Sequence, residues 1–298
     1  MSELIPVLTA VFVASSLVIL ILDRFSHPTL PAYIIAGLVL GSYLPETQFL
    51  SLSQLGIAFL VFIFGLKSDL GRIRNVAEES LSATLVQLAL AGTTMYIIGQ
   101  GLGFNQLNSL YLAAAAALSS SLVGLELIES EVRIDLLHGR LAEAIQLMQD
   151  FLAIIIIAVI GSGLTYYGIT QSLTALISMV VVALVFRQYL FSRVSKLTEG
   201  SEELLMVLSL GILTVFLAAS QYLGVSIVIG SFAAGLAVAR FPENMEILDT
   251  MGSLKDFFSA IFFVSLGALI TSPSTTALTL TGVLLIGTLF IKPAITGI

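Results

Sequence analysis

The feature that most constrains this chain is the segment spanning residues 139–161, GRLAEAIQLMQDFLAIIIIAVIG. It is long enough to cross a bilayer as a helix, yet Asp150 lies about 16 Å from its start at ~1.5 Å per residue. An aspartate at the centre of a spanning helix costs about 2.5 to 3.5 kcal/mol, so such residues usually face a polar interior and mark an ion or proton path. Gln149, beside it, adds an amide donor and acceptor.

The remainder of the chain is equally suited to a membrane. Of its 298 residues 57% are hydrophobic and only 10% are charged, and the mean hydropathy is +1.06, whereas soluble domains carry about 25% charged residues. We therefore predict an all-α polytopic membrane protein whose 298 residues leave no room for a folded soluble domain. The absence of cysteine excludes thiolate chemistry, and the two distant histidines do not form a zinc motif.

Apolar stretches separated by short polar or Pro/Gly breaks predict eleven helices. We expect them at residues 4–22, 30–44, 53–66, 81–102, 108–128, 139–163, 171–190, 204–220, 224–239, 256–271 and 277–298.

The basic residues predict how these helices are oriented. The odd-numbered connections hold eleven of the 12 Lys and Arg residues: Arg24, Lys67, Arg72, Arg74, Arg133, Arg140, Arg187, Arg193, Lys196, Arg240 and Lys255. The positive-inside rule makes these connections cytoplasmic and places the N-terminus outside. We expect a multi-pass protein of the cytoplasmic membrane.

Two pairs of segments indicate an internal repeat. PAYIIAGLVLGSYLP, around Gly37, resembles VIGSFAAGLAVARFP, around Gly235, and AFLVFIFGLKSDL, around Gly65, resembles FSAIFFVSLGALI, around Gly267. Both pairs are shifted by seven predicted helices, and an odd shift reverses the direction of crossing. The pattern predicts inverted repeats, the first at about residues 1–163 and an incomplete second at about 204–298, joined by a linker helix at about 171–190.

Three consecutive serines, Ser119, Ser120 and Ser121, interrupt the apolar stretch 108–128 near mid-membrane. Their oxygens can satisfy freed backbone groups or bind a cation, as unwound segments do in transporters. A face of small residues that lets two helices pack closely is the alternative interpretation. The serines alone do not decide between the two.

Two further charged residues could serve Asp150. Lys292 is the one base inside a predicted span, and it can either pair with the aspartate or extend towards the cytoplasmic rim. Glu143 precedes Asp150 by two helical turns on about the same face. It can line an inner approach to the aspartate or be a solvated residue of the first turn.

The segment GRLAEAIQLMQDFLAIIIIA resembles the signature of the monovalent cation:proton antiporter-2 family, particularly its Kef-type potassium/proton branch, in which a Gln-Asp pair occupies this place. Further blocks resemble the family in the same order: PAYIIAGLVLG, LGIAFLVFIFGLKSDL, LSSSLVGLELIES, GSFAAGLAVAR and DFFSAIFFVSLGALI. The resemblance covers nearly the whole chain. It departs from the family at Lys67, where an acidic residue is usual.

This resemblance implies an inverted-repeat sodium/proton-antiporter-like fold of thirteen helices with discontinuous crossing helices. It also implies a core domain that moves against a dimerisation domain, and a homodimer. Asp150 is implied to hold proton and cation alternately, Gln149 to take part in ion selection, the three serines to lie at the first helix crossing, and Lys292 to pair with the aspartate.

The repeat offset predicts a second broken helix near residue ~320, beyond Ile298. We therefore expect the chain to be truncated after its eleventh helix. Kef-type proteins also carry a cytoplasmic regulatory domain or subunit, which we expect outside this chain.

The predicted function is antiport of a monovalent cation, K⁺ or Na⁺, against H⁺ by alternating access. The resemblance favours potassium, and a sodium antiporter, a cation channel or a non-transporting subunit are the alternatives. We expect no enzyme, because intramembrane aspartyl proteolysis needs two facing aspartates. We likewise expect no cofactor besides the transported ions, and no nucleic acid. A monovalent cation is the metal that we expect at Asp150, and the lipid bilayer is the expected partner.

Overall fold

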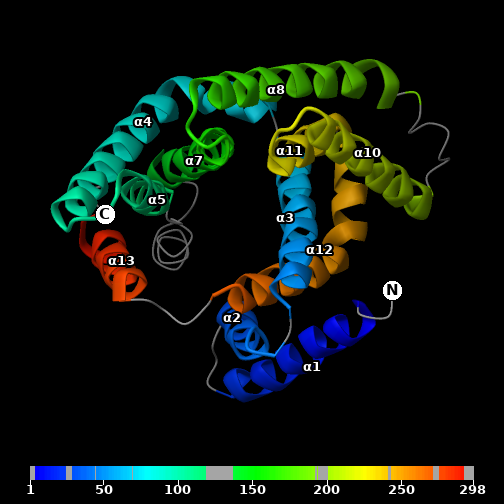
Figure 1. The fold of residues 1–298 in the computed structure, drawn as a ribbon. Helices are drawn as coiled ribbons and strands as arrows, with labels where there is room; N and C mark the ends of the chain where they lie inside the picture. Colours follow the sequence, from blue (N-terminus) through cyan, green and yellow to red (C-terminus); the bar gives the residue numbers. More distant parts are fainter. Residues whose placement is uncertain are drawn as a thin grey trace. The chain divides into compact units, whose positions relative to one another are not determined.

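The computed structural model describes residues 4–24, 29–43, 45–68, 70–118, 137–191, 193, 201–240, 243–270 and 275–291. These residues are nearly all helical, with no strand among them, and they form eleven α-helices and two π-helical segments (Figure 1). Six of the described helices are long and apolar enough to span a bilayer. The prediction of an all-α polytopic membrane protein is confirmed.

The chain divides into two compact units. The first comprises Met1–Ser68 and Ala158–Ser272 and the second Asp69–Ile157 and Pro273–Ile298. The first unit contains α1 (Leu4–Asp23), α2 (Thr29–Leu40), α3 (Glu46–Lys67), α8 (Tyr166–Val185) with the π-helical η1 (Phe186–Phe191), α10 (Glu202–Tyr222), α11 (Ile227–Val238) and α12 (Glu243–Ala268). The second contains α4 (Leu70–Gly101), α5 (Gln106–Ala117), most of α7 (Leu137–Gly161), and α13 (Thr275–Ile286) with η3 (Gly287–Ile291).

Each predicted helix corresponds to one observed helix, but three begin at least seven residues earlier than predicted. α3, α4 and α12 begin at Glu46, Leu70 and Glu243 rather than at residues 53, 81 and 256. Hydropathy marks the part of a helix that lies in lipid, whereas backbone hydrogen bonding continues through the polar residues before it. The predicted starts of α3, α4 and α12 were therefore wrong.

Polar residues at the predicted breaks start several helices. Asn105, Thr165 and Ser201 precede α5, α8 and α10, and each side chain accepts a hydrogen bond from the backbone N–H three residues later. Such a cap satisfies one of the amide donors that a helix N-terminus leaves unpaired.

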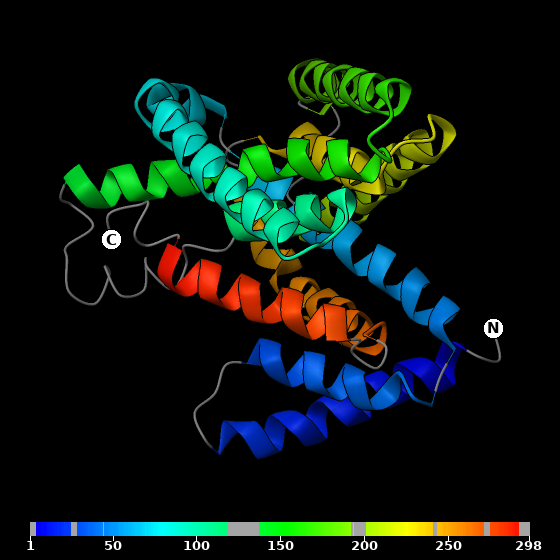
Figure 2. The ribbon, with the colours of Figure 1, turned by 60° about the vertical axis from the view of Figure 1, so that its left-hand side comes forward.

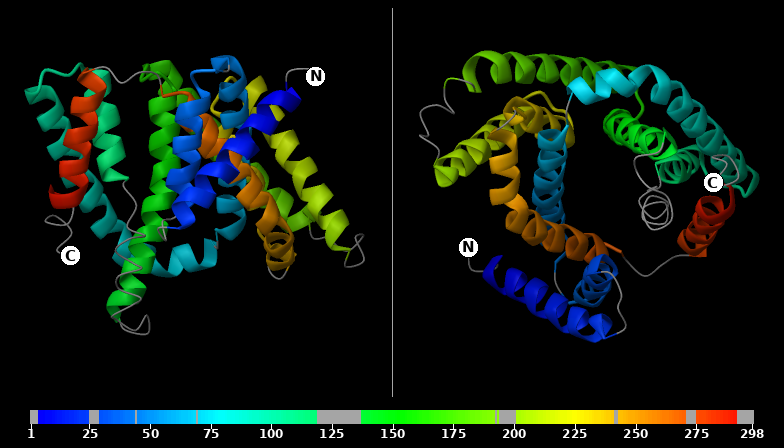
Figure 3. Two further views of the ribbon diagram at one scale, coloured as in Figure 1. Left: turned by 90° about the horizontal axis from the view of Figure 1, so that it is seen from below. Right: turned by 180° about the vertical axis from the view of Figure 1, so that it is seen from behind.

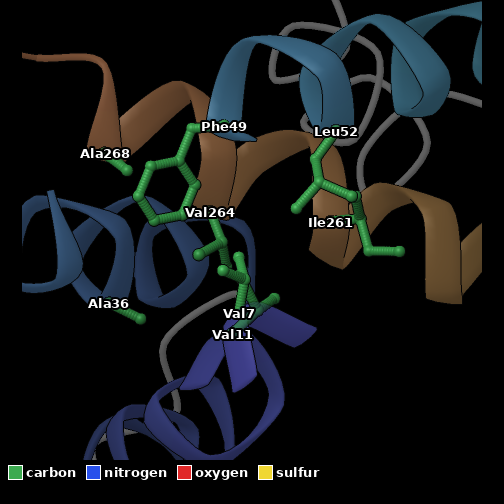
Figure 4. Close-up of a cluster of buried hydrophobic side chains, with 8 residues drawn as sticks. All are labelled: Val7, Val11, Ala36, Phe49, Leu52, Ile261, Val264 and Ala268. Carbon is green, nitrogen blue, oxygen red and sulfur yellow. The ribbon is translucent and has the colours of Figure 1, made fainter. Parts of the chain in front are cut away.

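The first unit is built around α3, α11 and α12. All residues from Val228 to Val238 of α11 are buried, as expected for a helix that is apolar on every side. One cluster of buried side chains joins four helices (Figure 4): Val7 and Val11 of α1, Ala36 of α2, Phe49 and Leu52 of α3, and Ile261, Val264 and Ala268 of α12. α1 and α2 run side by side at the edge of this unit (Figure 2).

Two glycine pairs in the first unit bring helix backbones very close together. A Cβ on Gly65 of α3 would lie 3.0 Å from Gly235 Cα of α11, and a Cβ on Gly37 of α2 would lie 2.9 Å from Gly267 Cα of α12. The sequence comparison equates Gly37 with Gly235 and Gly65 with Gly267. Replacing each glycine by its equivalent therefore turns the Gly37–Gly267 contact into the Gly235–Gly65 contact, as an internal two-fold repeat would.

In the second unit α13 packs against α4 and α5 (Figure 3). Buried Met95 of α4 and Leu112 and Ala116 of α5 form a cluster against which Leu280, Val283 and Leu284 of α13 lie. Gln100 Nε2 of α4 also donates to Ser109 Oγ of α5 at 2.9 Å. These contacts fix α5 laterally, so the position of its C-terminal end is set by packing.

Candidate functional site

The predicted ion-binding pair lies on α7. Its apolar part, Met148–Gly161, begins directly before the pair, and the preceding turns carry polar residues. The Gln149 side chain is only 2% exposed, and Asp150 is half-buried. A buried amide needs hydrogen-bonding partners inside the protein, because an unsatisfied one costs about 1 to 3 kcal/mol.

The amide nitrogen of Gln149 has its partner at the end of α5. This Nε2 atom donates to the carbonyl oxygen of Ala117 at 2.9 Å. Ala117 is the last residue of α5, and Leu118 has left helical geometry with φ −88° and ψ 5°. The last carbonyls of a helix lack partners within it, and the Gln149 amide satisfies one of them.

The depth of this contact follows from the helix lengths. Ala117 lies about 17 Å from the start of α5 at Gln106, and Gln149 about 18 Å from the end of α7 at Gly161, at ~1.5 Å per residue. In the predicted topology both of those ends are on the outer side. In that topology the two residues lie near the middle of a hydrocarbon core that is about 30 Å thick.

Electrostatically, this arrangement favours a cation. The C-terminal end of a helix carries roughly half a negative elementary charge, and α5 ends inside the membrane rather than in water. The Asp150 carboxyl group adds a titratable oxygen donor on the helix that contacts this end. Helix C-termini and exposed carbonyls at mid-membrane are what transporters use to coordinate Na⁺ or H⁺.

α4 contributes buried hydroxyls to the same unit. Ser80 and Thr84 are fully buried, and Thr84 Oγ1 donates to Ser80 O at 2.7 Å and lies 3.5 Å from Ile145 O of α7. We did not single out these residues in the sequence. The available signal was their spacing of four, which puts both on one face of the helix.

The remaining predicted residues fall partly or wholly outside the described part of the chain. Glu143 belongs to α7, but its side chain is not described. Ser119, Ser120, Ser121 and Lys292 lie outside the described residues, so the serine crossing and the Asp150–Lys292 pair stay predictions. Where side chains are described, no group of three or more His, Cys, Asp or Glu residues could hold a metal ion.

Comparisons with known proteins show which family and which relatives the chain is similar to. The family model described as sodium/hydrogen exchanger, transmembrane, matches residues 10–298. The chain is 24% identical over 260 residues to K(+) efflux antiporter 4 of Arabidopsis thaliana, covering 82% of this chain and 44% of that protein. It is also 24% identical over 228 residues to the high-affinity Na(+)/H(+) antiporter NhaS3 of a Synechocystis strain, covering 73% and 49%.

The fold has a solved counterpart. The structure of the sodium proton antiporter MjNhaP1 from Methanocaldococcus jannaschii at pH 8 matches with a TM-score of 0.64 and 17% identity, covering 99% of this chain and 77% of that one. This likeness confirms the antiporter-like fold. The chain spans about half the length of the two curated relatives described above.

Proposed function

The chain belongs to the transmembrane sodium/hydrogen exchanger family, and on this premise we propose that it exchanges a monovalent cation for protons across the cytoplasmic membrane. The observation that carries the proposal is the buried Gln149, which ties α7 to the mid-membrane end of α5 beside Asp150. An ionisable residue at this depth marks an ion or proton path.

Asp150 couples the two fluxes. A carboxylate that holds a proton cannot hold a cation at the same time, so each cation that binds displaces a proton. Access to the site alternates between the two sides of the membrane. No cofactor takes part in this exchange beyond the transported ions, and the named relatives are transporters rather than enzymes.

Potassium is the proposed ion, and sodium is the alternative. The Gln149–Asp150 pair resembles the potassium/proton branch, and one relative is named a K(+) efflux antiporter, but another is named a Na(+)/H(+) antiporter. The test is a transport assay with the full-length protein in liposomes that contain a pH-sensitive dye. Proton movement driven by an outward K⁺ gradient supports the proposal, whereas cation current without proton movement would indicate a channel, and no flux a non-transporting subunit.

The chain is proposed to contain an inverted repeat, with repeat one at about residues 1–163, a linker helix at about 171–190 and an incomplete repeat two at about 204–298. The support is that the sequence equivalence of Gly37 with Gly235 and of Gly65 with Gly267 relates the Gly37–Gly267 contact to the Gly235–Gly65 contact. By resemblance, the protein works as a homodimer, and a cytoplasmic regulatory domain or subunit accompanies it. Crosslinking of the purified protein would test the dimer.

Gln149 gives a prediction about ion affinity. Replacing Gln149 with Met keeps the shape but removes one buried hydrogen bond, the one to Ala117 O, at a cost of about 0.5 to 1.5 kcal/mol. We expect the apparent KM for the cation to rise about 2- to 13-fold, because this bond no longer holds the end of α5 against α7. Gln100→Met is the matched control, since it removes a similar amide bond, to Ser109, at the outer end of α4. Equal KM values in the two variants would contradict this role.

The proposed topology gives a second prediction, which is testable because the chain has no cysteine of its own. An impermeant maleimide should label single cysteines only from the cytoplasmic side when they are placed near Arg72, Arg133, Arg193 or Lys255. Cysteines at Tyr166 and Tyr222, which are 87% and 92% exposed at the opposite helix ends, should react only from outside. Labelling of two or more cytoplasmic sites from outside would overturn the topology.

A further inference from the structure

The last turn of α5 is in contact with two other helices of the second unit. Gln149 Nε2 of α7 donates to Ala117 O at 2.9 Å. α4 packs along the length of α5 (Figure 1). The position of the Ala117 carbonyl beside the predicted ion-binding pair therefore depends on α4 as well as on α7.

α4 and α5 meet at three successive levels among the residues described. At the first level Gln100 Nε2 donates to Ser109 Oγ at 2.9 Å, and a Cβ on Gly99 would lie 3.3 Å from Ser109 Cα. About one turn along α4, Met95 and Leu112 belong to one buried cluster. These two levels fix most of α5 laterally against α4.

At the third level α4 has no side chain. A Cβ on Gly92 would lie 3.8 Å from Ala117 Cβ and 3.9 Å from Ala113 O, and no other described atom lies within 4 Å of it. Both distances are ordinary van der Waals contacts, so a methyl group fits at this position and a larger side chain overfills it. Gly92 thus differs from Gly65 and Gly235, where a Cβ would already lie 3.0 Å or closer to backbone atoms.

A larger side chain at position 92 would displace the last turn of α5. The two facing atoms cannot turn away, because the alanine methyl group has no alternative rotamer and Ala113 O belongs to the backbone. Valine fills two of the three staggered positions on Cβ and keeps one rotamer in helices, so it cannot direct both methyl groups elsewhere. The helix ends at Ala117, so the displacement falls on the turn whose carbonyl Gln149 binds.

We propose that Gly92 is a positioning residue for ion exchange. Because residue 92 is small, the last turn of α5 lies where Ala117 O accepts the Gln149 amide, beside Asp150. Gly92 binds no ion itself and acts through Ala117. The inference rests on the proposed exchange at Asp150 and adds a residue of α4 that sets the affinity for the cation.

The experiment measures the apparent KM and the maximal rate of the full-length protein in proteoliposomes, with the cation that the unmodified protein exchanges. We expect Gly92→Val to raise the KM about 2- to 13-fold, as loss of one buried hydrogen bond does. The KM of Gly92→Ala should lie between those of Gly92→Val and the unmodified protein. A purely structural defect would lower the maximal rate, through loss of folded protein, and leave the KM unchanged.

Gly282→Val on α13 is the matched control. It makes the same change in a helix of the same unit, and no described atom lies within 4 Å of a Cβ built at Gly282. Its KM should equal that of the unmodified protein. A KM raised as much in Gly282→Val as in Gly92→Val would overturn the proposal, because the effect would then not depend on the contact with α5.

Two double variants test whether Gly92 acts through α5. Gly92→Val/Ala117→Gly removes the methyl group that the valine meets and should restore the KM. In Gln149→Met, which has already lost the bond to Ala117, Gly92→Val should raise the KM no further, because both changes break one interaction. An unchanged KM in Gly92→Val, no restoration by Ala117→Gly, or effects of Gly92→Val and Gln149→Met that multiply would each contradict the proposal.

Failure of this inference can be told from failure of the proposed function. If the unmodified protein exchanges ions and Gly92→Val has the same KM, only the role of Gly92 is wrong. If the unmodified protein exchanges no ions, the proposed function is wrong and this inference falls with it. If Gly92→Val does not fold, Gly92→Ser, which fills one staggered position on Cβ, takes its place, and an unchanged KM in that variant overturns the proposal.

Discussion

Replacing Asp150 with Asn is expected to abolish coupled exchange, reducing it to the rate of empty liposomes, while the helices stay folded. Asparagine keeps the shape of the side chain and some oxygen coordination but cannot bind or release a proton in this pH range. Without that titration, cation binding no longer displaces a proton. The measurement is proton movement in proteoliposomes under imposed K⁺ and Na⁺ gradients, across pH.

Two variants sharpen this test. Asp249→Asn makes the same chemical change at an exposed position of α12 and should exchange at the unmodified rate. Asp150→Glu keeps a titratable carboxyl group in a displaced position and should retain part of the activity. Robust exchange with Asn at position 150 would refute the mechanism, whatever the family membership.

Replacing Gly235 with Ala is expected to destabilise the first unit strongly. A Cβ at this position would lie 2.7 Å from both Gly65 Cα and Leu66 N of α3. These are backbone atoms, so the contact cannot be relieved by a side-chain rotation, and α3 and α11 must separate. Overpacking of this kind typically costs about 1 to 3 kcal/mol, occasionally more. The loss should be visible as a lower Tm in detergent.

Gly211→Ala is the matched control, because no atom lies within 4 Å of a Cβ built at Gly211 of α10. Alanine is favoured over glycine in helices by about 1 kcal/mol, so this variant should melt at the same temperature or higher. Gly37→Ala should behave like Gly235→Ala, since Gly37 makes the corresponding contact with Gly267. Equal Tm values for Gly235→Ala and Gly211→Ala would show that the close crossing does not limit stability.

Membrane class, helix number and family could all be predicted from the chain itself. A bilayer requires each spanning segment to satisfy its own backbone and to be apolar over a set length, so hydropathy alone locates the helices. The segment around Asp150 and five further blocks in the same order predicted the family that the family model then confirmed. Helix starts were not predictable in this way, because the polar first turns of α4 and α12 lie beyond the apolar stretch.

Contacts between distant segments were decided only by the tertiary structure. The sequence equated Gly37 with Gly235, but nothing in it specified that Gly37 would contact Gly267, since that pairing depends on how whole helices pack. Similarly, the sequence marked Gln149 as an amide donor and acceptor beside Asp150. Its partner is the main-chain carbonyl of Ala117, and a backbone group leaves no signature in the order of side chains.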